Sequence, residues 1–149
     1  MSKLLQSNTQ LGEVVYPAQA DLSSAAVAPG NARLLKTVNN AGATNFALPA
    51  VKTDVVTYIG TDCDSATAGK NASAFPLDPT RQMRAYLKGA CAVGDKLVPA
   101  DPTVAADAGK VIKGVAAYGT VQVVGIAEEA GVDGQLVLFR PLMLGFQVF

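Results

Sequence analysis

The sequence of 149 residues contains no histidine and no tryptophan, and it has only two cysteines. The absence of histidine removes the commonest general base, the usual imidazole metal ligand and every catalytic triad built on that residue. Two cysteines, Cys63 and Cys91, are too few and too irregularly placed for a disulfide framework, so each is expected to be a small buried apolar residue. These absences exclude most familiar hydrolases and the disulfide-rich secreted domains.

Charge is also scarce. Charged residues make up 16% of the chain, against about 25% in an average soluble domain. Twelve basic residues balance twelve acidic ones, which argues against nucleic acid as a partner, because phosphate binding needs clustered lysine and arginine. No run reaches the roughly 20 apolar residues of a membrane-spanning helix, and the start of the chain lacks a signal peptide. We expect a soluble, unsecreted chain with no membrane partner, partly covered by other protein subunits.

No motif completes a catalytic or metal site. Glu128 and Glu129 are adjacent, and neighbours on an extended chain face opposite sides, so they do not flank one bond as a glycosidase pair does. Asp62 and Asp64 have the alternate spacing of a calcium loop, but the glycine and the bidentate glutamate that such a loop requires are missing. We therefore predict that the chain is not an enzyme and holds no metal and no cofactor.

Residues 1–50 contain five charged residues and are rich in alanine, serine, asparagine, glycine and proline. Their apolar residues form short islands, such as Val14-Val15-Tyr16 and Leu34-Leu35, and no helical period persists beyond about two turns. Residues 1–50 are therefore predicted to be an extended N-terminal arm with one or two short strands, ordered mainly by the surface it lies against.

Residues 51–149 are predicted to form one all-β module, a small barrel or sandwich. Residues 54–60 have strand composition, and the punctuated segment after them is expected to be a loop. Further strands are expected over 81–88, 95–99, 110–118, 120–127 and 135–142, with at most one helical turn at 104–107. In the first of these, Met83, Ala85 and Leu87 share the face expected in the core. Nine of the fourteen glycines lie from Gly89 onward, between short apolar runs, which is typical of barrels and sandwiches.

Three segments carry a resemblance to a known family. They are PLDPTRQMRAYLKGACAVGDKLVPA (76–100), GKVIKG (109–114) and VVGIAEEAGVDGQLVLFRPL (123–142). Their turns and strands resemble those of tailed-bacteriophage head decoration proteins, also called capsid cement proteins, over about the last 75 residues. The resemblance implies an all-β module, often trimeric, on the outside of an icosahedral head assembled in the host cytoplasm. Its partners would be the major capsid protein and other copies of this chain.

The same resemblance implies that the N-terminal arm reaches neighbouring subunits. The last nine residues, 141–149, carry no charge and are expected to be buried against the barrel or a neighbouring subunit. Backbone pairing of strands between chains gives affinity, and alternate side chains give register. The residues expected to make capsid or subunit contacts are Leu4, Leu5, Val14, Val15 and Tyr16 in the arm, and Phe146, Val148 and Phe149 in the tail.

Alternatives remain open from the sequence alone. The chain fits other virion roles, such as a head fibre base or a tail-tube component. A small carrier or ligand-binding barrel, of the lipoyl or biotinyl type, is also glycine-punctuated, but the best hairpin tip, Gly131-Val132-Asp133-Gly134, lacks the lysine that carries the cofactor. A lyase or isomerase using lysine, tyrosine and aspartate has no supporting constellation.

Overall fold

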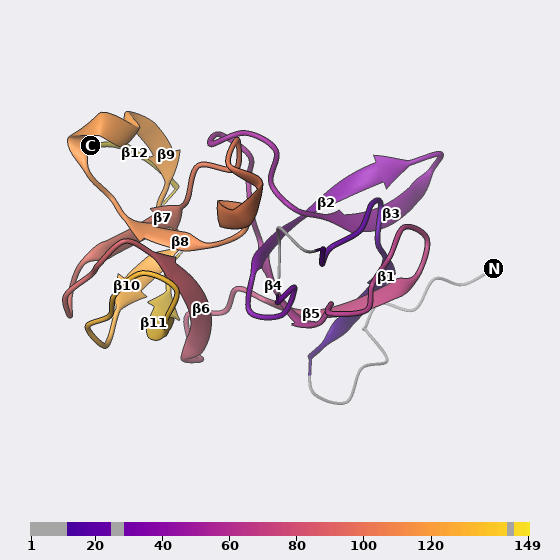
Figure 1. Cartoon of the computed structure of the whole chain (residues 1–149), viewed down its shortest axis with the longest axis horizontal. Coiled ribbons are helices and arrows are strands. Elements are labelled where there is room, and N and C mark those ends of the chain that lie inside the picture. Colours follow the sequence, from indigo (N-terminus) through magenta and orange to yellow (C-terminus); the bar gives the residue numbers. More distant parts are fainter. Residues whose placement is uncertain (1–11, 25–28, 143–144) are drawn as a thin grey trace.

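A computed structural model describes residues 12–24, 29–142 and 145–149, and these residues form two β structures that lie side by side (Figure 1). The first is a five-stranded sheet in the order β1-β5-β4-β2-β3, and the second is a closed five-stranded barrel in the order β10-β11-β6-β8-β7. The prediction of an all-β fold is confirmed. The strands of the first sheet are β1 (Val14–Pro17), β2 (Leu34–Asn40), β3 (Ala43–Ala47), β4 (Tyr58–Asp62) and β5 (Asn71–Pro76).

The first sheet curls until its two edge strands meet. Ala18, at the end of β1, forms a parallel bridge with Phe46 of β3, and the N–H of Gln19 donates to the carbonyl of Phe46 at 2.9 Å. Leu35, Phe46, Cys63 and Ala74 are buried inside the curl. We call this part of the chain the N-terminal sheet.

The predicted arm over residues 1–50 therefore needs correction for its described part. Residues 14–47 supply three strands of a sheet with its own core, and β4 and β5 complete that sheet from beyond residue 50. Short apolar islands become strands because each one pairs along its length with a segment distant in the sequence, a partnership that local periodicity does not reveal. Likewise, residues 71–76, expected in a loop, form β5.

The hairpin between β2 and β3 has a clear local cause. Ala41 and Gly42 both have positive φ, of 52° and 86°. Positive φ at both central residues is typical of the two-residue type I′ turn, whose twist matches that of the paired strands. The Asn39 side chain accepts a hydrogen bond from the Gly42 N–H at 2.9 Å. The hairpin then sets the β2–β3 register that buries Phe46.

The barrel follows the sequence prediction more closely. Its strands are β6 (Met83–Lys88), β7 (Lys96–Pro99), β8 (Val111–Lys113), β10 (Gly125–Ala127) and β11 (Leu136–Pro141). Met83, Ala85 and Leu87 are buried, as predicted, and alternate with more exposed neighbours. The helical turn expected at 104–107 is the short 3-10 helix η1 (Ala105–Asp107).

The strand expected over 110–118 is shorter than predicted. It ends at Lys113 and is followed by a second 3-10 helix, η2 (Ala116–Tyr118). β9 (Thr120–Gln122) then pairs with β12 (Phe146–Val148) in a separate two-stranded sheet. The buried Gln122 side chain joins β9 to the β3–β4 loop, because it accepts from the N–H and donates to the carbonyl of Val56, each at 2.9 Å.

Two turns of the barrel, residues 92–95 and 132–135, make matching sets of backbone hydrogen bonds. Cys91 and Gly131, which precede them, exchange backbone hydrogen bonds of 3.0 and 3.1 Å. The N–H of Gly94 donates to the carbonyl of Ala127, and the N–H of Gly134 donates to that of Leu87, both at 2.8 Å. Each turn is therefore held by the strand that precedes the other, and we call this pair the clasped turns.

One buried hydrophobic cluster contains residues from both parts of the molecule. Leu34, Val56 and Ile59 from the N-terminal half belong to the same cluster as Leu87 and Phe139 of the barrel. The two parts therefore share apolar packing across the boundary expected at residue 50.

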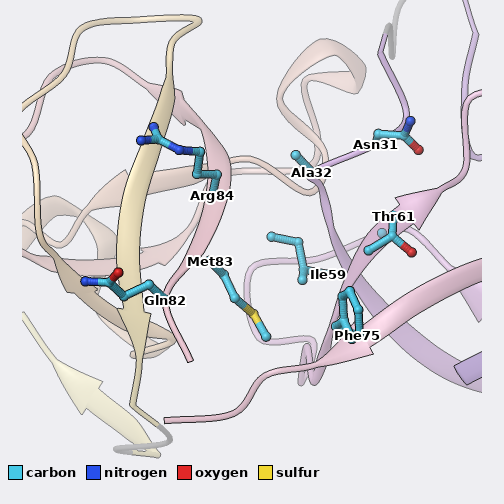
Figure 2. A pocket seen from close by; sticks show the side chains of 9 residues that line it. Asn31, Ala32, Ile59, Thr61, Phe75, Gln82, Met83 and Arg84 are labelled. Atoms are coloured by element: carbon cyan, nitrogen blue, oxygen red, sulfur yellow. The ribbon is translucent and has the colours of Figure 1, made fainter. Parts of the chain in front are cut away.

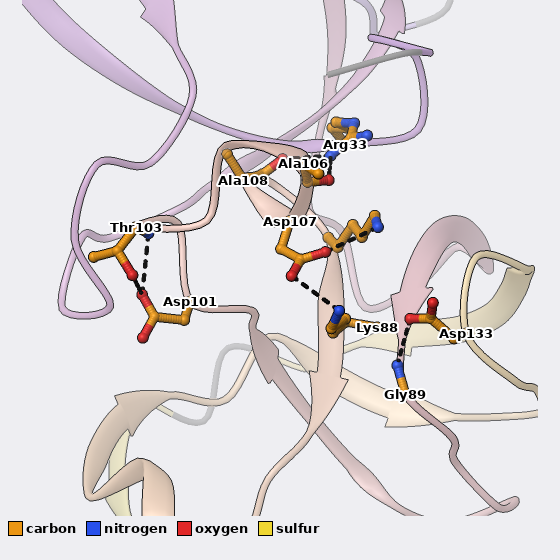
Figure 3. Close-up of polar contacts among 10 residues, drawn as sticks. Arg33, Lys88, Gly89, Asp101, Thr103, Ala106, Asp107, Ala108 and Asp133 are labelled. Carbon is orange, nitrogen blue, oxygen red and sulfur yellow. Dashed lines mark hydrogen bonds and ion pairs between the residues drawn. The ribbon is translucent and has the colours of Figure 1, made fainter. Parts of the chain in front are cut away.

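Arg33 links the two parts through polar contacts (Figure 3). It is 2% exposed, and its guanidinium donates to the carbonyls of Pro29, Ala106 and Ala108 at 2.9, 2.9 and 2.7 Å. Burial lowers the pKa of Arg33, and the nearby Asp107 carboxylate acts in the opposite direction. The charge is retained, since the ordinary pKa of arginine lies far above neutrality.

Asp107 forms the second part of this junction. Its carboxylate lies 3.1 Å from the Lys88 ammonium and 2.9 Å from that of Lys110. Burial by itself raises the pKa of Asp107, but its hydrogen bonds and attraction to the two lysines outweigh this and hold the pKa below its ordinary value of 3.8.

Replacing Arg33 with lysine is expected to lower the free energy of unfolding by about 2–3 kcal/mol. The three carbonyls are arranged around a planar guanidinium group, and a single ammonium in its place does not reach all of them. Urea unfolding followed by circular dichroism measures this change. Arg84→Lys is the matched control, since Arg84 is half exposed and its loss is expected to stay within about 1 kcal/mol. Equal losses in the two variants would contradict the role of Arg33.

Thermal stability is expected to be flat between about pH 5.5 and 8, because no histidine titrates there, and to fall below about pH 4. A carboxyl whose folded pKa is lowered stabilises the fold above its unfolded pKa, and this contribution disappears as pH falls through the folded pKa. Asp107→Asn is expected to be less stable at pH 7 and to lose less stability on acidification. A melting-temperature series from pH 2.5 to 8 measures both effects, and an unchanged acid slope would contradict them.

Candidate interaction surfaces

Two of the predicted arm contacts, Val14 and Tyr16, pack against the chain's own core. The Tyr16 ring centroid lies 5.0 Å from that of Phe46, and Val14 packs against the same cluster. Val15, on the other face of β1, is 45% exposed. Leu4 and Leu5 lie outside the described residues. Among the three described arm residues, Val15 therefore presents the most accessible side chain to a neighbour.

The predicted tail contacts divide between the interior and the surface. The Phe149 ring packs against Gly114 and the cluster around Val98 and Val121, where a Cβ on Gly114 would overlap the ring. Phe146 and Val148 are 45% and 79% exposed. The structure thus brings Phe146 and Val148 together on β12 as an apolar surface.

The two clasped turns carry exposed apolar residues that sequence reasoning missed. Val93 and Val132, in these turns, are 68% and 57% exposed, and Leu136 at the start of β11 is also exposed. The sequence showed these turns as glycine punctuation and gave no sign that they meet. A signal was present, however, because the pattern of a small residue, a turn glycine and then a strand recurs forty positions apart around Gly94 and Gly134.

A hollow of about 350 Å³ lies where the N-terminal sheet meets β6 (Figure 2). Ile59, Phe75 and Met83 line its apolar part. Two polar lining residues are already bonded to neighbours: Arg84 pairs with Glu129 at 2.7 Å, and Gln82 donates to Glu128. The hollow therefore suits apolar contact better than acid–base chemistry.

The carboxylates singled out from the sequence have structural partners. Glu128 pairs with Arg140 at 2.8 Å. Hydrogen bonding to Arg84 and to the backbone of Leu138 lowers the pKa of Glu129. Asp64 closes a loop by accepting from the N–H groups of Gly30 and Asn31 at 2.6 and 3.0 Å.

Within the described residues, no group of three or more His, Cys, Asp or Glu side chains is placed to hold a metal ion. Over the same ranges, no helix has the length and hydropathy needed to cross a membrane.

The basic side chains of residues 81–88 are engaged in intramolecular contacts. Lys88 contacts Asp107, Arg84 contacts Glu129, and the Arg81 guanidinium lies 5.4 Å from the Phe75 ring. Tyr86 lies under Arg33, 6.0 Å from its guanidinium carbon. These positive charges therefore contribute to the fold at the junction and along β6 of the barrel.

Together these features define a small all-β protein in which a curled five-stranded sheet is packed against a closed barrel, with exposed apolar residues at the barrel turns and on β12. The chain is similar to the crystal structure of the head fibre gp8.5 N base in bacteriophage phi29. The TM-score is 0.62 at 18% sequence identity, covering 88% of this chain and 93% of that chain. No protein-family model and no curated protein matches the chain.

Both thiols are expected to be unreactive in the folded protein. Burial, with the Asp62 carboxylate nearby, raises the pKa of Cys63 to about 11, and burial also raises the pKa of Cys91. Since the thiolate is the reactive form, a colorimetric disulfide reagent at pH 8 is expected to label native protein slowly and to label two thiols rapidly in denaturant. Rapid labelling of two thiols without denaturant would contradict this.

Proposed function

We propose that this chain is a structural protein of a tailed-phage head that binds the outside of the icosahedral capsid and stabilises the lattice by bridging major capsid subunits. The observation that carries the proposal is the shared fold with a head fibre base over nearly the whole of both chains. The resemblance of residues 76–142 to head decoration proteins points independently to the same place in the virion. We also propose that the protein performs this role without catalysis and without a cofactor.

Stabilisation would follow from linkage. A protein that binds only the assembled lattice shifts the equilibrium toward it by mass action. When one molecule contacts several subunits, each contact after the first is intramolecular, so weak contacts add to a strong attachment. A trimer would multiply this effect, and the trimeric state remains a prediction.

The clasped turns supply the surface that best suits capsid contact. Val93 and Val132 are exposed apolar side chains on turns whose backbones are fixed by reciprocal hydrogen bonds. A surface already rigid before binding loses little conformational freedom on docking, which favours affinity. The occupant would be an apolar, uncharged patch of the major capsid protein.

A head fibre base is the second candidate, and the similarity to the phi29 protein favours it directly. The two roles differ in consequence, because a decoration protein strengthens the shell, whereas a fibre base carries a further structure on it.

Empty heads lacking this protein, mixed with the purified chain, test both roles. We expect binding at a fixed ratio to the major capsid subunit and an increase in the temperature at which the heads break. Fixed-ratio binding without thermal protection would favour the fibre base, and binding at a single vertex would favour a tail or portal role. Absence of binding would overturn the proposal.

A matched pair of double variants tests the contact surface. Val93→Lys with Val132→Lys is expected to weaken head binding by at least about tenfold, because two charges would be desolvated at an apolar contact. Val51→Lys with Val104→Lys is the control, since these valines are also more than half exposed but lie in other loops. Equal binding by the two double variants would exclude the turns as the contact surface.

A further inference from the structure

The backbone of β12 is hydrogen-bonded along one edge only in the described chain. β12 pairs with β9, and the N–H of Val123 donates to Gly145 at 2.9 Å while the N–H of Phe149 donates to Gly119 at 3.2 Å. In an antiparallel ladder, bonded and non-bonded pairs alternate. Residues 145, 147 and 149 therefore face β9, and Phe146 and Val148 direct their N–H and C=O groups to the opposite, outer edge.

The outer edge of β12 carries none of the features that normally protect an edge strand. Proteins block such edges with charges, prolines, bulges or a covering element. Residues 145–149 contain no charge and no proline, and Phe146 and Val148 add exposed apolar side chains. β12 lies at the end of the molecule away from β2 and β3, and among the described strands it pairs with β9 alone (Figure 1).

We propose that β12 pairs antiparallel with β12 of a second copy of this chain, about a two-fold axis at Gln147. Residue 146 of each copy would then face residue 148 of the other in a hydrogen-bonded pair. Four backbone hydrogen bonds would form, satisfying every outward N–H and C=O of Phe146 and Val148. β9 and β12 of the two copies would make one continuous four-stranded sheet.

The side chains are self-complementary in this register, and this favours a second copy over an unrelated strand. Phe146 of each copy lies opposite Val148 of the other, on one face of the sheet, and aromatic with β-branched pairs stabilise neighbouring strands. Gln147 meets its counterpart on the other face, where the Lys96 ammonium of each copy donates a hydrogen bond to the Gln147 side-chain oxygen at 2.8 Å. Within the paired segment, no like charges face each other.

Three residues per strand bury little area, so the pairing is expected to be weak and reversible in solution. Stable dimers usually bury about 800 Å² on each partner. Copies held side by side on a capsid would pair at high effective concentration, and this last step alone rests on the proposed function. Self-association is measured without heads, so its failure and the failure of head binding are distinguishable.

Cross-linking through Gln147→Cys tests the register. Residue 147 of the two copies would form a non-hydrogen-bonded pair with Cα atoms about 4.5 Å apart, within disulfide range. The native thiols are buried, so the full chain without substitution provides the background. Val93→Cys, on an exposed turn of the barrel, is the matched control. We expect several times more covalent dimer from Gln147→Cys on mild oxidation at equal concentration, and equal yields would overturn the proposal.

Two further substitutions in the Gln147→Cys chain test the backbone pairing. Val148→Pro removes the outward N–H while residues 145, 147 and 149 keep their bonds to β9, and it is expected to reduce cross-linking by about tenfold. Val148→Lys places a charge on the edge at a largely exposed side chain, so folding is retained, and it is expected to reduce cross-linking similarly. Unchanged yield in a variant that melts like its parent would overturn the proposal.

Discussion

The architecture depends on the docking of the 105–110 turn against the start of β2. Leu34 donates its N–H to the carbonyl of Gly109 at 2.7 Å, and Arg33 holds the carbonyls of Ala106 and Ala108 from the preceding position. Gly109 has φ of +77°, and a Cβ there would lie 2.9 Å from the Leu34 carbonyl oxygen. This close backbone approach seats one turn of the barrel on the N-terminal sheet and lets both share the core around Leu34.

This arrangement leaves the outer surface of the barrel available for contacts. Charged side chains near the junction and on β6 are paired with one another, as Lys88 is with Asp107 and Arg84 with Glu129. Among the exposed apolar residues, Val93, Val132 and Leu136 lie at the barrel turns, and Phe146 and Val148 lie on β12. Exposed apolar residues of this kind suit docking to other protein subunits.

Sequence reasoning was most successful where periodicity and turn chemistry agreed. β6 was predicted together with its buried face, because Met83, Ala85 and Leu87 alternate with polar residues and are followed by a turn glycine. It was wrong for residues 14–47, where three strands form without a long periodic run. For the candidate contacts, Phe146 and Val148 are exposed and their contact role stays a prediction, whereas the apolar character of Tyr16 gave no indication that it would pack against Phe46.

The sequence by itself determined that this protein is built of strands, has no histidine for general acid–base chemistry or metal binding, and carries little charge. These properties follow from residue type and local spacing. Only the tertiary structure decided that residues 14–47 contribute three strands to a sheet, that Arg33 joins this sheet to the barrel, and that Cys91 and Gly131, beside the two turns, pair with each other. The reason is that strand pairing and buried hydrogen bonds connect residues far apart in the chain, and their free energy depends on which segments meet in space.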